Sequence, residues 1–138
     1  MIKIYPKITN LFSRKKTVEI VAQPVSNYQK QIQELNTFCN HLYEYKKGVR
    51  QLILTTEKDC YRKTIEEKLT KEKIDFLINP VTKEKINVFF GAKECVDVVK
   101  TFNAKLNKIT PEQDFMLGIM LGYDKVAQCL RYLKMKTK

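Results

Sequence analysis

The sequence predicts an α/β (α+β) fold in which a small, three-stranded mixed sheet is packed against about five helices. Three short runs rich in β-forming residues predict strands at residues 49–55, 74–78 and 86–90. Around them lie longer stretches whose apolar residues recur three or four positions apart, as in amphipathic helices. A chain of 138 residues that is 43% hydrophobic can bury a core without disulfides or a metal ion.

The first helix is expected to start after Ser26 and to end at Gly48. Ser26 and Gln29 form a capping box, and apolar residues then recur at helical spacing up to Tyr45. Two lysines precede Gly48, where cations suit the negative end of the helix dipole and glycine allows the left-handed turn that ends a helix. The strand at 49–55 follows directly.

The predicted strand directions follow from the connections. Thr56 and Asp59 form a capping signal for a second helix that runs to about Lys71, between the first and second strands. A helical connection of this kind joins parallel strands. Asn79 and Pro80 start a turn, after which the third strand is expected to run antiparallel to the second. The predicted sheet is mixed for this reason.

Three helices are expected after the last strand. One runs from about Ala92 to Leu106, and the next starts at Thr110, where proline and a capping-box glutamine follow the N-cap threonine. This helix, residues 111–121, is apolar nearly all round, so it is expected to lie in the core or against a second subunit. Asp124 is expected to cap the last helix. Its apolar stripe consists of Val126, Cys129, Leu130 and Leu133.

Gly118 and Gly122 lie four positions apart, one within helix 111–121 and one directly after it. Their small size allows a second backbone to approach closely. Packing within the chain and packing in a homodimer both explain this spacing. The candidate dimer-interface residues are Phe115, Gly118, Ile119 and Gly122.

Basic residues exceed acidic ones, 26 to 15, which gives a net charge of +11. Residues 1–25 hold five basic and one acidic residue, and residues 125–138 hold five basic and none acidic, so the two ends contribute +4 and +5 of that total. We therefore predict a basic N-terminal arm (1–25), a single domain (26–133) and a basic C-terminal tail (134–138). Such ends attract nucleic acid, an anionic membrane surface or an acidic protein, or they serve only as solvated tails.

Motifs that carry chemistry are absent from the sequence, so no catalytic, cofactor-binding or metal-binding residue is assigned. The glycines form no phosphate-binding loop, the cysteines contain no CxxC pair, and neither GxSxG nor HExxH occurs. His41, the only histidine, lies at the edge of an apolar helix face and is expected to be packed and hydrogen-bonded. The four cysteines are expected to be reduced and buried, as in a cytosolic protein. Because no signal peptide or run of about 18 apolar residues occurs, the protein is expected to be soluble and cytoplasmic.

Four pieces of the chain resemble a family of short bacterial proteins that is classed only as a domain of unknown function. They are His41–Arg50, Phe89–Gly91, Asp114–Asp124 and Gln128–Tyr132, within residues 38 to 133. The resemblance implies a compact domain of three strands and about five helices that forms a homodimer, and it associates the family with flavodoxin through neighbouring genes. It supplies no reaction. The motif residues whose role it leaves open are His41, Tyr43, Tyr45, Tyr123 and Asp124.

The function that these observations favour is that of a non-enzymatic interaction module, because the sequence offers excess positive charge and no catalytic motif. Its partner is expected to be an acidic protein, and flavodoxin is a candidate since flavodoxins are acidic. The candidate partner-binding residues are Lys46, Lys47, Arg50, Arg131, Lys134, Lys136 and Lys138. One alternative is a nucleic-acid-binding protein that uses its basic ends. Another is a small-molecule or flavin-binding protein whose tyrosines and histidine line a pocket.

Overall fold

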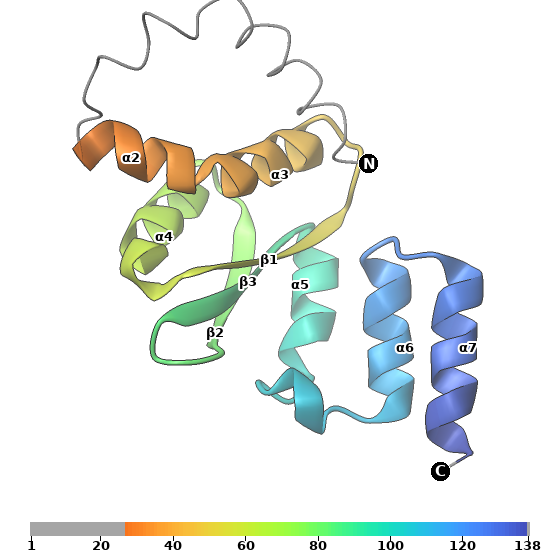
Figure 1. Ribbon diagram of the computed structural model, residues 1–138. Helices are drawn as coiled ribbons and strands as arrows, with labels where there is room; N and C mark the ends of the chain where they lie inside the picture. The colour runs from red at the N-terminus through yellow and green to blue at the C-terminus, as the bar shows by residue number, and fades with distance from the viewer. Residues whose placement is uncertain (1–26, 138) are drawn as a thin grey trace, which may run out of the picture. The chain divides into compact units, whose positions relative to one another are not determined.

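A computed structural model describes residues 27–137. The chain divides into two compact units, Met1–Glu34 and Leu35–Lys138. Helix α2 (Asn27–Glu34) is the described part of the first unit, and α3 (Asn36–Lys46) opens the second (Figure 1). The single first helix expected from the sequence is therefore two helices, with Leu35 between them. The predicted arm at residues 1–25 and the cap at Ser26 lie outside the described residues.

The second unit has an α+β fold with the predicted number of strands. One-turn 3-10 helices at Asp59–Tyr61 and Leu106–Lys108 lie in its connections. The elements after α3 are β1 (Leu52–Lys58), α4 (Arg62–Lys71), β2 (Asp75–Pro80), β3 (Lys85–Gly91), α5 (Lys93–Lys100), α6 (Pro111–Met120) and α7 (Lys125–Lys136).

The three strands lie in the order β1-β3-β2, and both pairings are antiparallel. Strands β1 and β2 do run in the same direction, but β3 separates them, so the prediction of a mixed sheet was wrong. The composition of β3 explains its central place. Val88, Phe89 and Phe90 are consecutive and all buried, and a strand that is apolar on both faces is best buried between two neighbours.

Several element boundaries also differ from the prediction. Thr56, expected to cap a helix, lies within β1 opposite Asn87 and donates a hydrogen bond of 2.7 Å to the Asn87 side chain. Helix α4 consequently begins at Arg62, after the 3-10 turn. Asn79 and Pro80 are the last two residues of β2 rather than a turn. In each case cross-strand pairing with β3 extends a strand beyond the point where local residue preferences would end it.

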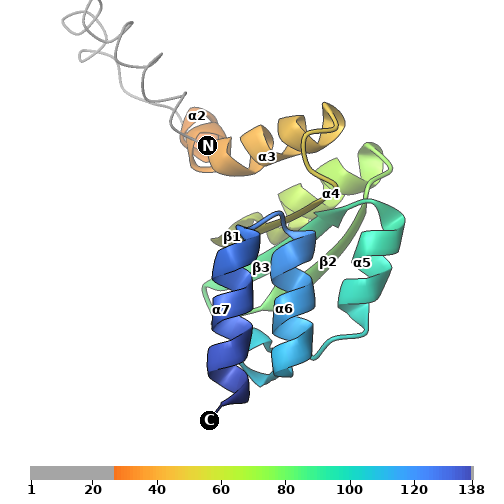
Figure 2. The same ribbon diagram turned by 90° about the vertical axis from the view of Figure 1, so that its right-hand side faces the viewer.

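Helices cover both faces of the sheet, as Figures 1 and 2 show. Alternate residues of each strand point to opposite faces, so the sheet contributes to two cores. The first core lies under α3 and α4 and contains Phe38, Leu42, Ile53, Ile65, Leu69, Ile86, Val88 and Phe90. The second lies under α5 and α6 and contains Leu52, Phe89, Val96, Val99, Leu117 and Leu121.

The cysteines do not lie where the sequence suggested. All four are free thiols, but Cys39, Cys60 and Cys129 are exposed and Cys95 is half-buried. The expectation that all four are buried was wrong, because three lie on exposed sides of their helices and Cys95 packs only at the edge of the second core. Burial of part of its surface still raises the pKa of the Cys39 thiol, and the nearby Lys68 lowers it by less.

Residues 27–137 contain no helix with the length and apolar character needed to cross a membrane. Nor do three or more His, Cys, Asp or Glu side chains gather in this range as metal ligands would. The cytoplasmic location stays a prediction.

Candidate functional site

Helices α6 and α7 form an antiparallel pair at the C-terminal end of the second unit (Figures 1 and 2). The predicted capping box starts α6, since the Thr110 side chain accepts from the Gln113 N–H and the Gln113 side chain accepts from the Thr110 N–H. The predicted cap of α7 is present too, because an Asp124 carboxylate oxygen accepts from the Ala127 N–H at 2.8 Å. Capping therefore explains the motif residue Asp124.

The turn between these helices needs Gly122. Its φ of +82° lies in the left-handed region, where glycine avoids the strain that a side chain would cause. The N–H groups of Gly122 and Tyr123 donate to the carbonyls of Ile119 and Gly118, each at 3.0 Å, which closes the end of α6. Helix termination thus accounts for Gly122 without a second subunit.

Gly118 lies where α6 packs against α7. It is buried, and a Cβ at this position would overlap the side chain of Gln128 on α7. Nearby, the rings of Phe115 and Tyr132 lie 5.5 Å apart. Two of the candidate dimer-interface residues, Phe115 and Gly118, are therefore engaged within the chain, while Ile119 is half-buried. A role for these residues in a dimer stays a prediction.

Polar contacts attach α7 to α6. Arg131 donates to both carboxylate oxygens of Asp114, at 2.8 and 3.2 Å, and Lys136 lies 2.9 Å from the Glu112 carboxylate. The hydroxyl of Tyr132 also donates to Glu112, at 3.1 Å. These bonds occupy two of the basic residues that the sequence proposed for partner binding.

The opposite side of α7 is apolar and exposed. Val126, Leu130 and Leu133 are 66%, 64% and 57% exposed, and their spacing of four and three residues places them on one stripe. No residue of α7 is buried. The sequence correctly predicted this stripe, which faces solvent because α6 contacts the other side of α7. We call Val126, Leu130 and Leu133 the α7 stripe.

Basic residues border the α7 stripe. Helical geometry puts Lys134 along one border, and Lys125 and Lys136 along the other. Lys125 and Lys134 make no ion pair with the described residues, whereas Lys136 is paired with Glu112. The helix extends through Lys136, so three of the residues assigned to the C-terminal tail, Lys134, Met135 and Lys136, are helical. Lys138 lies outside the described residues.

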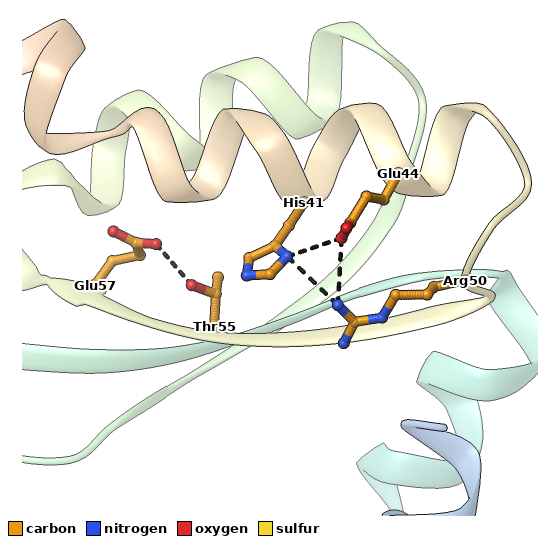
Figure 3. Close-up of polar contacts among 5 residues, drawn as sticks. All are labelled: His41, Glu44, Arg50, Thr55 and Glu57. Carbon is orange, nitrogen blue, oxygen red and sulfur yellow. Dashed lines mark hydrogen bonds and ion pairs between the residues drawn. The ribbon is translucent and has the colours of Figure 1, made fainter. Parts of the chain in front are cut away.

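A second group of polar side chains lies between α3 and β1 (Figure 3). Nδ1 of His41 lies 3.1 Å from Oε1 of Glu44, which also accepts from Arg50 at 3.3 Å. The side chains of His41, Glu44 and Arg50 are 17%, 17% and 18% exposed. The prediction that His41 is packed and hydrogen-bonded is confirmed. The polar groups of these three residues are hydrogen-bonded to one another, and these bonds hold the loop after α3 against that helix.

Glu57 is a buried carboxylate that the sequence analysis missed. It is 8% exposed on the face of β1 beneath α3, and the hydroxyl of Thr55 donates to it at 2.7 Å (Figure 3). Burial raises the pKa of the Glu57 carboxyl, while the Thr55 hydrogen bond and the charge of His41 lower it by less. Strand alternation from the buried Ile53 was the signal, because it places residues 55 and 57 on the core face.

Replacing Glu57 with glutamine is expected to raise the melting temperature at pH 7. A carboxyl whose pKa is raised by folding favours the folded state below its unfolded pKa, and this contribution is lost as the pH rises through the folded pKa. Glutamine stays neutral and can still accept from Thr55, so the gain should disappear near pH 4, where glutamate is largely protonated in both states. Thermal melts followed by circular dichroism at the two pH values test this.

The matched control is Glu67→Gln on the exposed side of α4. It removes the same charge without relieving a buried carboxylate, so its effect should be small at both pH values. A Glu57→Gln protein that melts below the wild type at pH 7 would show that ionised Glu57 stabilises the fold, contrary to the expectation.

The remaining candidate residues lie on the α3 side of the sheet. The ammonium of Lys46 lies 2.8 Å from Glu72, and that of Lys47 lies 5.5 Å from the ring centre of Tyr43. Tyr45 packs edge-on against Phe90, with ring centres 6.4 Å apart, so its role is structural. Since α7 lies on the α6 side of the sheet, the structure does not join the α3 and α7 candidates into one surface (Figure 1). Tyr123 is 49% exposed in the turn after α6.

These features define a class of small α+β protein, in which helices cover both faces of a three-stranded antiparallel sheet. The family described as "Protein of unknown function (DUF2023)" matches residues 36–135. The match includes the whole sheet and helices α3 to α7 except the last residue of α7, and the chain belongs to this family. The resemblance to a family of unknown function is thereby confirmed. No curated protein matches the chain.

Proposed function

We propose that this protein is a non-enzymatic interaction module that binds an acidic protein through α7. The exposed α7 stripe supports this proposal more than any other observation. Contiguous apolar side chains with a polar border are typical of protein-binding surfaces, where the apolar centre is buried and the border stays hydrated. Each of the three aliphatic side chains of the α7 stripe is more than half exposed, so they contribute little to holding α7 against its own domain.

Charge supports an acidic partner. The chain carries a net charge of +11, and the lysines at the borders of the α7 stripe add local positive charge. Opposite charge around an apolar contact speeds association and selects among partners. Flavodoxin, which the resemblance associates with this family, is the acidic protein we propose to test first.

The same surface argues against nucleic acid as the main partner. Protein surfaces that bind nucleic acid are polar and strongly positive, and a sugar-phosphate backbone offers little to bury three aliphatic side chains. The flavin-binding alternative places its ligand among tyrosines, whereas Tyr45 is held in the first core and Tyr132 contacts α6.

Leu130→Ser is expected to weaken flavodoxin binding roughly tenfold or more, because it removes the centre of the apolar contact. Since Leu130 is exposed, the variant should keep the wild-type melting temperature. Lys134→Glu is expected to weaken binding most at low salt, and the difference should shrink at about 0.5 M salt. Isothermal titration calorimetry with purified flavodoxin measures both effects.

Lys63→Glu is the matched control for Lys134→Glu, since it makes the same charge change at an exposed position on α4. It should leave the affinity nearly unchanged. If Leu130→Ser and Lys134→Glu bind flavodoxin as tightly as the wild type, α7 is not the binding surface. If flavodoxin does not bind and single-stranded or duplex nucleic acid does, with a steep salt dependence, the nucleic-acid alternative takes its place.

A homodimer through the α7 stripe is a second proposal, which follows from the resemblance and from the same exposed residues. Two antiparallel copies of α7 would bury the stripe but would bring the lysines at its borders together. Salt screens such repulsion. Dimer formation should therefore strengthen as salt rises, whereas binding of an acidic partner should weaken, and light scattering after size-exclusion chromatography separates the two cases.

A further inference from the structure

An open groove lies between α3 and α4, on the side of the sheet away from α6 and α7. Its volume is about 540 Å³, which is within the range of small-ligand sites. Residues from α3 and from the end of α4 line it, and they combine positive charge, one carboxylate, one phenol ring and a thiol. The residues that carry the argument are Tyr43, Lys46, Lys47, Lys68 and Glu72.

Glu72 fixes two lysines side by side at this groove. Its Oε1 atom lies 2.8 Å from Nζ of Lys46, and its Oε2 atom lies 3.0 Å from Nζ of Lys68. These two ammonium groups lower the pKa of the Glu72 carboxyl to about 2, so the carboxylate stays charged at neutral pH. Each ammonium carries three N–H donors and uses one of them on Glu72. The others remain available to an anion.

The charge of the groove is not balanced by its own residues. Lys46, Lys47 and Lys68 carry three positive charges, and Glu72 carries one negative charge, so a net charge of about +2 remains at neutral pH. A phosphate monoester carries nearly two negative charges under the same conditions. Lysine is a common phosphate ligand in proteins, acting as a point charge with several donors.

Tyr43 adds an aromatic surface to this cationic site. Its side chain is 59% exposed, and Lys47 lies 5.5 Å from the ring centre on one side. Exposed tyrosines next to lysines stack on nucleic-acid bases, because every base has a planar face and the phosphate nearby meets a cation. The first core does not use this ring, unlike that of Tyr45, which packs on Phe90.

We propose that the groove binds a mononucleotide, with the phosphate at Lys46 and Lys68 and the base stacked on Tyr43. The pairing by Glu72 pre-positions the two lysines, which reduces the entropy lost on binding. This site is independent of the α7 stripe, which lies on the other side of the sheet (Figures 1 and 2).

Titration of the full chain with AMP, adenosine and inorganic phosphate tests the proposal, with isothermal titration calorimetry at low salt. AMP is expected to bind more tightly than either of its parts. Lys68→Ala should lower the affinities for AMP and for inorganic phosphate by similar factors, since it removes a side chain that binds the phosphate. Tyr43→Ala should lower the affinity for AMP roughly tenfold and leave the affinity for inorganic phosphate unchanged. Tyr43→Phe should bind AMP as tightly as the wild type does.

Both substituted side chains are exposed, to 59% at Tyr43 and 46% at Lys68, and the variants should melt near the wild-type temperature. Lys63→Ala on α4 is the control for lost charge outside the groove, and Leu130→Ser should bind AMP normally. Failure of AMP to bind the wild type would overturn the proposal. Equal affinities for AMP and inorganic phosphate would also overturn it, because they would indicate an anion site only. A single-stranded oligonucleotide that binds through the same residues more tightly than AMP would overturn it as well.

Discussion

Phe90→Ala is expected to lower the free energy of unfolding by about 3–5 kcal/mol. Phe90 is fully buried near the end of β3, the central strand, and contacts two aromatic residues of α3. Its ring centre lies 5.6 Å from that of Phe38 and 6.4 Å from that of Tyr45, both in edge-to-face arrangements. Alanine would leave a cavity between the sheet and α3 and would remove both ring contacts.

Urea unfolding at pH 7 measures this loss, with Phe115→Ala as the matched control. Phe115 is also in ring contact, with Tyr132, but it is only half-buried between α6 and α7. Its truncation should cost about 1–2 kcal/mol, because less apolar surface is lost and α7 can shift to fill the space. Equal losses for the two variants would show that the first core does not depend on Phe90 as the structure implies.

Gly91→Ala is expected to lower the free energy of unfolding by roughly 3 kcal/mol or more. The φ of Gly91 is +148°, which side-chain-bearing residues rarely adopt, and an added Cβ would overlap the Gln51 carbonyl oxygen. That oxygen accepts from the Ala92 N–H at 2.9 Å. Gly91 also lies opposite both Leu52 and Asp75, so the three backbones cannot separate without breaking the end of the sheet.

Gly48→Ala is the control that separates backbone strain from the steric overlap of the added Cβ. Gly48 has a φ of +78°, but open space surrounds the position where its Cβ would lie. It should therefore cost only about 1 kcal/mol, the price of placing alanine in a left-handed conformation. Thermal melts of the two variants, compared with the wild type, should differ clearly. A Gly91→Ala protein as stable as Gly48→Ala would mean that β1 and β3 are farther apart than the structure shows.

Features that depend on neighbouring residues could be predicted from the sequence. The capping box at Thr110 and the cap at Asp124 each involve residues three positions apart, and both are present. The three strands were also found, because runs of β-forming residues identify them locally. Their ends were less certain, as β1 shows by continuing past Thr56 to Lys58.

Features that depend on residues far apart in the sequence could not be predicted in this way. The sequence gives no direct sign that β3 inserts between β1 and β2, since both antiparallel and parallel arrangements satisfy the same hydrophobic pattern. Periodicity identified the α7 stripe but not whether it meets solvent or core. The groove needs Lys46 and Glu72, which are 26 residues apart and meet only because α3 and α4 cover the same face of the sheet.

The strand order β1-β3-β2 also affects how the protein is made. Each outer strand forms its hydrogen bonds with β3, which comes last of the three in the chain. During synthesis, β1 and β2 leave the ribosome before either has a partner, and each presents unpaired backbone groups until residues 85–91 follow. Neither pairing of the sheet can therefore form before β3 is made, and a truncated polypeptide that ends at Pro80 retains two strands that do not pair with each other in the native fold.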